Sequence, residues 1–185
     1  MSPGVSHLND LHLLLDEGTE HTSFVPLFHH LGRFAVKRGA GTVRVMPLRK
    51  LFYRIELTVT GALKIAGFGV AFTGIPAGVD YAGNIVTTPV VHRPELTPVA
   101  GSAFCGALLA PRFADGEQVI LTLTSGTREL GRMALSEFLA QHDTHIDFTA
   151  PEVVIPIRIE VGATEATIVV NDWDEGAIQI PIIGH

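Results

Sequence analysis

The sequence is poor in the residues that covalent cross-links and metal centres need. It has one cysteine in 185 residues, Cys105, which excludes an internal disulfide, a cysteine-based zinc site and an iron–sulfur centre. No apolar run reaches the roughly 18 residues of a membrane-spanning helix. Only 17% of residues are charged while 46% are hydrophobic, which argues against a disordered chain and predicts a sizeable packed core.

Chain-breaking residues are spread along the whole sequence. Nineteen glycines and eleven prolines are too many for a helical bundle and favour short strands joined by turns. The sequence has no βαβ rhythm of strand and helix, so it offers no basis for a doubly wound parallel sheet.

Charge is unevenly distributed. The net charge is −6, yet residues 31–64 hold eight cations and one acid, whereas residues 65–185 hold five arginines and fourteen acids. Two interpretations stay open: opposite charges meet between neighbouring strands or are solvated, or a basic face binds lipid headgroups or an acidic partner. Aromatic residues are not interleaved with the cations, so a nucleic-acid partner is not expected.

Two segments show strict β alternation. In Arg54–Thr60 and again in Val153–Val161, apolar side chains occupy alternate positions, so each predicts a strand with one buried face. Pro156 cannot donate to a ladder, which predicts that the second strand lies at an edge or carries a bulge. A hairpin is expected to follow at Gly162.

Further short strands complete the expected fold. Residues 74–83 are expected to be a loop, because they are rich in Gly, Pro and Asp. One short helix is predicted around Met133–Leu139. The pattern indicates an all-β, antiparallel two-sheet β-sandwich over residues 41–185, preceded by a connecting segment or the tail of an earlier domain over residues 1–40. The additional strand candidates are 64–73, 85–91, 102–109, 118–124 and 128–132.

No catalytic constellation is evident. Cys105 lies in an apolar strand and is expected to be a buried, unreactive thiol. His142, His145 and Asp147 have a spacing that one helical turn could bring together on a metal, which leaves a metal-dependent enzyme as a distant alternative to a solvated loop. We therefore expect no enzyme activity, no metal site and no cofactor.

The single tryptophan marks the best candidate binding site. Trp173 follows an apolar strand and is flanked by Asp172 and Asp174. It either fills the end of the core or, with these carboxylates, forms the platform of a carbohydrate- or ligand-binding module.

The order of segments resembles fimbrillin-type proteins of the Bacteroidales, in particular the C-terminal domain of FimB-like fimbrial anchor or accessory subunits. The opening strand is similar to the family's, and so are the Gly-rich turn, the closing strands and the segment leading out of an N-terminal domain. These likenesses lie in Val45–Val59, Phe72–Asn84, Asp147–Thr149 with the strand behind it, Ile168–Trp173 and His21–Phe34.

The resemblance implies a transthyretin-like, Greek-key type sandwich that acts as a structural or anchoring subunit of fimbriae. It also implies assembly with other fimbrial subunits by inter-subunit β-strand addition, and attachment to the outer membrane through a lipid anchor. Residues 1–7 do not resemble a signal peptide. A cell-surface location is therefore expected on the assumption that an export signal lies upstream of this chain.

Overall fold

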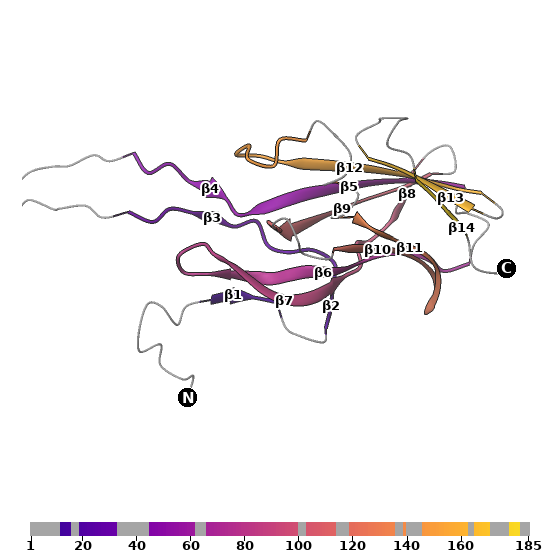
Figure 1. Cartoon of the computed structure of the whole chain (residues 1–185), viewed down its shortest axis with the longest axis horizontal. Coiled ribbons are helices and arrows are strands. Elements are labelled where there is room, and N and C mark those ends of the chain that lie inside the picture. Colours follow the sequence, from indigo (N-terminus) through magenta and orange to yellow (C-terminus); the bar gives the residue numbers. More distant parts are fainter. Residues whose placement is uncertain are drawn as a thin grey trace, which may run out of the picture.

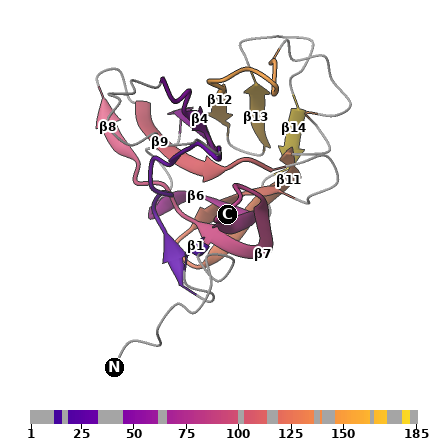
Figure 2. The ribbon, with the colours of Figure 1, turned by 90° about the vertical axis from the view of Figure 1, so that its left-hand side faces the viewer.

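The computed structural model describes residues 12–15, 19–32, 45–61, 66–99, 103–113, 119–135, 139, 146–162, 165–170 and 178–181. These residues form two six-stranded sheets and a separate two-stranded ribbon (Figure 1). Viewed from one end of the molecule, the two sheets appear as an upper and a lower layer (Figure 2). The predicted two-sheet β-sandwich is therefore confirmed.

The first sheet has the strand order β11-β10-β6-β7-β2, and β1 also pairs with β6. Its pairs are antiparallel except for β2, which runs parallel to β7. The strands are β1 (His12–Leu14), β2 (Glu20–His21), β6 (Phe68–Asp80), β7 (Ile85–His92), β10 (Ile120–Ser125) and β11 (Arg128–Ala134).

The second sheet has the order β14-β13-β12-β5-β9-β8, and its one parallel pair is β12 with β5. Two further short strands, β3 (Phe28–His29) and β4 (Arg49–Lys50), form the ribbon. The strands of the second sheet are β5 (Phe52–Thr60), β8 (Thr97–Val99), β9 (Ala103–Pro111), β12 (Val154–Val161), β13 (Glu165–Val170) and β14 (Ile178–Pro181).

The core lies between the two sheets, and the predicted alternation locates it correctly. Every apolar residue of the alternating sets in β5 and β12 is buried, whereas Arg54, Val154 and Glu160 on the opposite faces are exposed. Facing them from the first sheet are buried side chains of β6 and β10. The buried residues that meet here include Ile55, Leu57, Val59, Ile155, Ile157, Ile159, Val70, Phe72, Ile75, Leu121 and Leu123.

The loop predicted over 74–83 is wrong for most of its length, because β6 continues to Asp80. Two register shifts in the β6–β7 ladder accommodate the turn-forming residues. The first lies between Phe72 and Ile75, where Gly74 has a φ of 81° that suits a bulge. Pairing with a neighbouring strand thus outweighs the local preference for a turn, which begins only at Tyr81.

The prediction from Pro156 that this strand lies at an edge or carries a bulge is also wrong, since the register of β12 with β5 runs without a shift from Val154 to Glu160. β12 has β5 on one side and β13 on the other. Pro156 is the third residue of the strand, and the described pairing with β13 starts one residue later, at Ile157. One missing donor near the start of a strand therefore does not place that strand at an edge. The predicted hairpin after Val161 is confirmed, with Gly162 N–H donating to Glu165 O over 2.8 Å.

The predicted short helix is met in part. Met133 belongs to β11 and not to a helix, while Leu135 and Leu139 have helical backbone and join the core; the residues between them lie outside the described part. Within the expected connecting segment 1–40, β1 and β2 pair with the first sheet. The prediction that this segment leads out of a preceding domain stays a prediction.

Candidate functional site

The long strand β6 has an edge that its neighbours cover unequally. β10 pairs with residues 68–73 of β6, and β1 occupies the same edge further along, at Gly78–Asp80. Between these stretches, Leu15 N–H donates to Ala77 O over 2.9 Å. β1 therefore completes an edge of β6 that β10 leaves open.

Strand β1 is attached by its backbone more than by its side chains. It has three residues, and the side chains of Leu13 and Leu14 are 39% and 47% exposed. Gly78 permits the close approach, since a Cβ there would lie 1.8 Å from Leu13 O. Because both leucines are only partly buried, main-chain hydrogen bonds are an important part of the docking of β1, and each contributes a modest net free energy.

The opposite layer is braced near its junction with the ribbon by Arg112. Its guanidinium donates from Nη1 to Phe148 O over 3.2 Å, and from Nη2 to Ala150 O and Pro151 O over 2.7 and 3.1 Å. It also lies 5.3 Å from the centre of the Tyr53 ring. Arg112 thus fixes the turn that leads into β12 and holds it against β5.

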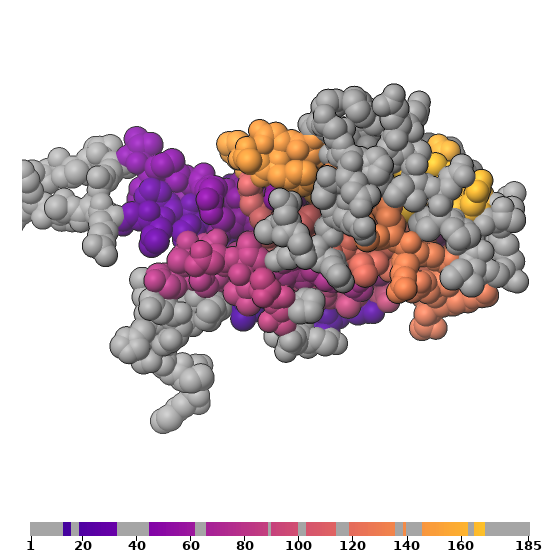
Figure 3. Space-filling view, viewed as in Figure 1, coloured from indigo at the N-terminus to yellow at the C-terminus, as the bar shows by residue number. Residues whose placement is uncertain are grey.

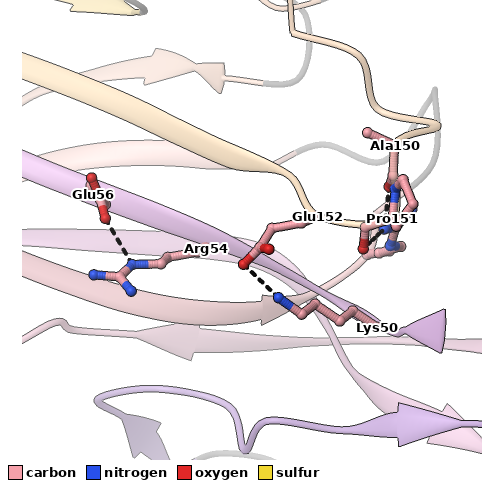
Figure 4. Close-up of polar contacts among 7 residues, drawn as sticks. Lys50, Arg54, Glu56, Ala150, Pro151 and Glu152 are labelled. Carbon is pink, nitrogen blue, oxygen red and sulfur yellow. Dashed lines mark hydrogen bonds and ion pairs between the residues drawn. The ribbon is translucent and has the colours of Figure 1, made fainter. Parts of the chain in front are cut away.

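Two ion pairs lie on the same part of the second sheet (Figure 4). Lys50 Nζ lies 2.5 Å from Glu152 Oε1, and Arg54 Nε lies 2.8 Å from Glu56 Oε1. Hydrogen bonding and attraction from Lys50 lower the pKa of Glu152. Lys50 of the basic segment therefore meets an acid from the later, acidic part of the chain, whereas Arg54 pairs with the acid of its own strand β5.

The predicted site residues fall largely outside the described part of the chain. This applies to Trp173, Asp172 and Asp174, and also to His142 and His145. Asp147 is described, and its Oδ1 accepts hydrogen bonds from Thr149 N–H and Oγ1–H at 2.9 and 2.6 Å. These bonds lower the pKa of Asp147 and give it a turn-forming role.

The described residues contain neither a cluster of metal-binding side chains nor a membrane-spanning helix. Their histidines, cysteine and acids include no group of three or more that could bind a metal ion. Within the same residues, no helix has the length and apolar character needed to span a bilayer.

The expectation of a buried thiol is wrong. Cys105 is exposed, because it lies on the outer face of β9. Its register partners are Thr58 of β5 and Thr97 of β8, both exposed. An apolar run in a strand of a sandwich does not bury every side chain, since alternate residues face away from the core.

The ribbon and its flanks form a surface that the sequence patterns did not reveal. We call the described residues 25–32 and 45–50 the arm. Its attachment to the body includes Leu51 N–H donating to Leu27 O over 3.1 Å and a hydrogen bond of 3.0 Å between His29 Nε2 and Tyr81 O. The apolar residues of 21–35 show no period, and a period is what indicates a buried face. That missing period was the available signal for an exposed apolar segment.

Comparison with known proteins identifies the family. No curated protein matches the chain. A family model described as fimbrillin-A associated anchor proteins Mfa1 and Mfa2 matches residues 1–176.

Solved structures share the fold at low sequence identity. The fimbrial anchor protein Mfa2 from Porphyromonas gingivalis has a TM-score of 0.53 and 14% identity, over 79% of this chain and 55% of that one. A candidate adhesin of Bacteroides ovatus has a TM-score of 0.64 and 13% identity, over 98% of this chain and 67% of that one. A candidate polysaccharide-binding protein of Bacteroides thetaiotaomicron has a TM-score of 0.66 and 14% identity, over 100% of this chain and 70% of that one. The chain thus spans 55% of the anchor protein's length, and by its family match it belongs to the fimbrillin-A associated anchor proteins Mfa1 and Mfa2.

Proposed function

We propose that this chain is a non-enzymatic structural or anchoring subunit of cell-surface fimbriae that supports adhesion. In this role it joins other fimbrial subunits by β-strand addition at the edge of β6. Family membership supports the fimbrial role. A cell-surface location follows from that role, and attachment to the outer membrane through a lipid anchor belongs to the same proposal.

The observation that carries strand addition is the weak cover of β6 by β1. An uncovered strand edge presents N–H and C=O groups that a strand of another subunit can pair with. β1 offers three residues of pairing and leaves both of its leucines exposed. A longer incoming strand with apolar side chains at alternate positions would bury more surface than β1 does and would displace it.

The test controls access to the β6 edge. In a Cys105→Ser background, Leu13→Cys and Val79→Cys place two thiols at register partners, so that oxidation locks β1 in place. Leu15→Pro instead removes the N–H that donates to Ala77 O and loosens the segment. The probe is a fluorescent peptide with the sequence of residues 10–17, followed by anisotropy.

We expect the peptide to bind the Leu15→Pro variant, and the oxidised double-cysteine protein to exclude it until the disulfide is reduced. Binding that persists in the oxidised protein would place strand addition at another edge. Absence of binding to every variant would contradict strand addition for this chain.

A carbohydrate-binding role for Trp173, Asp172 and Asp174 is the second candidate, favoured by the fold shared with a candidate polysaccharide-binding protein. Trp173 is the only tryptophan, so its fluorescence reports directly on this site. A shift on addition of soluble mannan or dextran that Asp172→Asn abolishes would support the role. Unchanged emission with both glycans would count against it.

A further inference from the structure

Strand β2, which lies beyond β7 in the first sheet, is held in place by few contacts. It pairs with β7 at two positions only, Glu20 with Val91 and His21 with His92. Two further contacts hold it: Arg93 N–H donates to His21 O over 2.7 Å, and Arg93 Nε lies 2.6 Å from Glu20 Oε1. β2 lies at the margin of the body beside β7 (Figure 1), and indigo atoms of the N-terminal segment follow the same lower margin (Figure 3). So short a contact can open while the rest of the sheet stays paired.

A firm attachment to the second sheet follows β2 directly. Phe24 is buried, and its N–H donates to Leu109 O of β9 over 2.8 Å. Leu109 N–H donates in return to Ser23 Oγ over 2.8 Å. A segment that leaves β7 is therefore still held at Ser23 and Phe24, so the chain between β2 and this attachment can act as a hinge.

The residue that β2 covers is an imidazole without a hydrogen bond. His92 is fully buried, and within the described part of the chain neither of its ring nitrogens has a partner. Its register neighbour on β6 is Phe72, a core residue, and its register neighbour on β2 is His21, with ring centres 6.0 Å apart. A proton on His92 would therefore be a buried charge that no acceptor among the described residues stabilises.

The charged groups near His92 do not stabilise its proton either. β2 brings Glu20 and His21, and Arg93 follows β7; Glu20 and Arg93 pair with each other. Of the described ionisable groups, His21 is the one whose charge acts on His92, and it opposes protonation. Burial, and to a smaller extent this repulsion, lower the pKa of His92 to about 4. Acid therefore favours any state in which the ring meets water.

We infer that β2 and the pair His21–His92 form an acid-sensitive switch: protonation of His92 releases β2 from β7 while the rest of the sandwich stays folded. The His92 ring then meets water on the side that β2 had covered, and His21 moves away with β2. Among the described residues, β7 has strand pairing on this side only at Val91 and His92, so release leaves its whole outer edge open. The switch does not rest on strand addition at the β6 edge, and either can fail while the other holds.

Amide hydrogen exchange of the whole chain tests the inference. The Arg93 N–H reports on β2, because it donates to His21 O, and the Arg54 N–H, which donates to Val153 O over 3.0 Å, reports on the second sheet. With a pKa of about 4 in the closed form and 6.5 for a hydrated ring, the open population should rise about thirtyfold between about pH 7.5 and about pH 5. The protection factor of the Arg93 N–H, corrected for the intrinsic pH dependence of exchange, should fall by the same factor.

Low concentrations of urea separate local release from unfolding of the whole molecule. Exchange through a local opening exposes little surface and changes little with urea, whereas exchange through global unfolding becomes faster. At the lower pH we expect the Arg93 N–H to be less protected than the Arg54 N–H and nearly independent of urea.

Two variants identify the group responsible. His92→Leu keeps a buried side chain of apolar character and removes the titration, so the protection factor of the Arg93 N–H should be the same at both pH values. Glu20→Gln is the matched control, since it removes the ion pair with Arg93 and leaves both imidazoles in place. In this control the full change with pH should remain.

Three results would overturn the inference. The first is a protection factor of the Arg93 N–H that is equal at both pH values in the wild type. The second is the same fall in His92→Leu, or loss of the fall in Glu20→Gln, which would assign the effect to the ion pair. The third is exchange of the Arg93 N–H with the urea dependence of the Arg54 N–H, which would show that β2 leaves only when the whole protein unfolds.

Discussion

The buried histidine of β7 makes the stability of this protein depend on pH. His92 is fully buried, and neither of its ring nitrogens has a hydrogen-bond partner among the described residues. Its ring centre lies 6.0 Å from that of His21 in the neighbouring strand β2. Burial, with a smaller contribution from the charge of His21, lowers the pKa of His92 from 6.5 to about 4.

The direction of the effect follows from which state binds the proton. In the unfolded chain His92 takes up a proton as pH falls through about 6.5, whereas in the folded protein it stays neutral until pH approaches 4. The stability that depends on this group is therefore complete above pH 6.5 and lost progressively down to pH 4. The full loss is about 3 kcal/mol, of which about 2 kcal/mol is reached by about pH 5.

Urea unfolding of the wild type and of His92→Leu, at about pH 7.5 and about pH 5, measures this contribution. Carboxylates titrate in both proteins, so the informative quantity is the difference between them. Leucine has no titratable group, and the variant should lose about 2 kcal/mol less than the wild type on acidification. His30→Leu changes an exposed histidine and is the control. An equal loss in wild type and His92→Leu would refute the reasoning.

Three further predictions concern packing and the edge of β6. Arg112→Ala should reduce the free energy of unfolding by about 2–4 kcal/mol, because it removes three charged hydrogen bonds and the contact with Tyr53. Chemical denaturation measures this loss. A loss below about 1 kcal/mol would contradict the stabilising role of Arg112. Phe72→Ala should reduce the free energy of unfolding by about 3–5 kcal/mol, because Phe72 is fully buried. A denaturation midpoint equal to that of the wild type would show that Phe72 is not in the core. Gly78→Ala should displace β1, because its Cβ would collide with Leu13 O, and limited proteolysis should then cut near β1 faster than in the wild type. Unchanged cleavage would show that β1 tolerates the side chain.

Strand positions in the core were predictable because the signal is local and periodic. From Val153 through β12 the buried residues recur at every second position, and burial of all five confirms that pattern. The order of neighbouring strands was not predictable in this way. β12 pairs in parallel with β5, about a hundred residues earlier in the chain, and nothing in either segment identifies the other.

The functional surfaces were less accessible from sequence than the core. Val45, Met46 and Leu48 are residues of the kind found in a core strand. They are exposed because they lie on the projecting arm. The family resemblance located the segment without indicating its exposure. Trp173 was the most conspicuous candidate, and it remains a prediction because it lies outside the described residues.

Alternating apolar residues and frequent chain breaks were sufficient to establish a two-layer β protein. Each strand must bury one face, and this need is visible in the alternation of neighbouring residues. The continuation of β6 through Gly74 and Pro76, the isolation of His92 and the exposure of Cys105 all depend on which strand lies alongside. Hydrogen-bond pairing between distant segments supplies that information, and its free energy belongs to the folded chain as a whole.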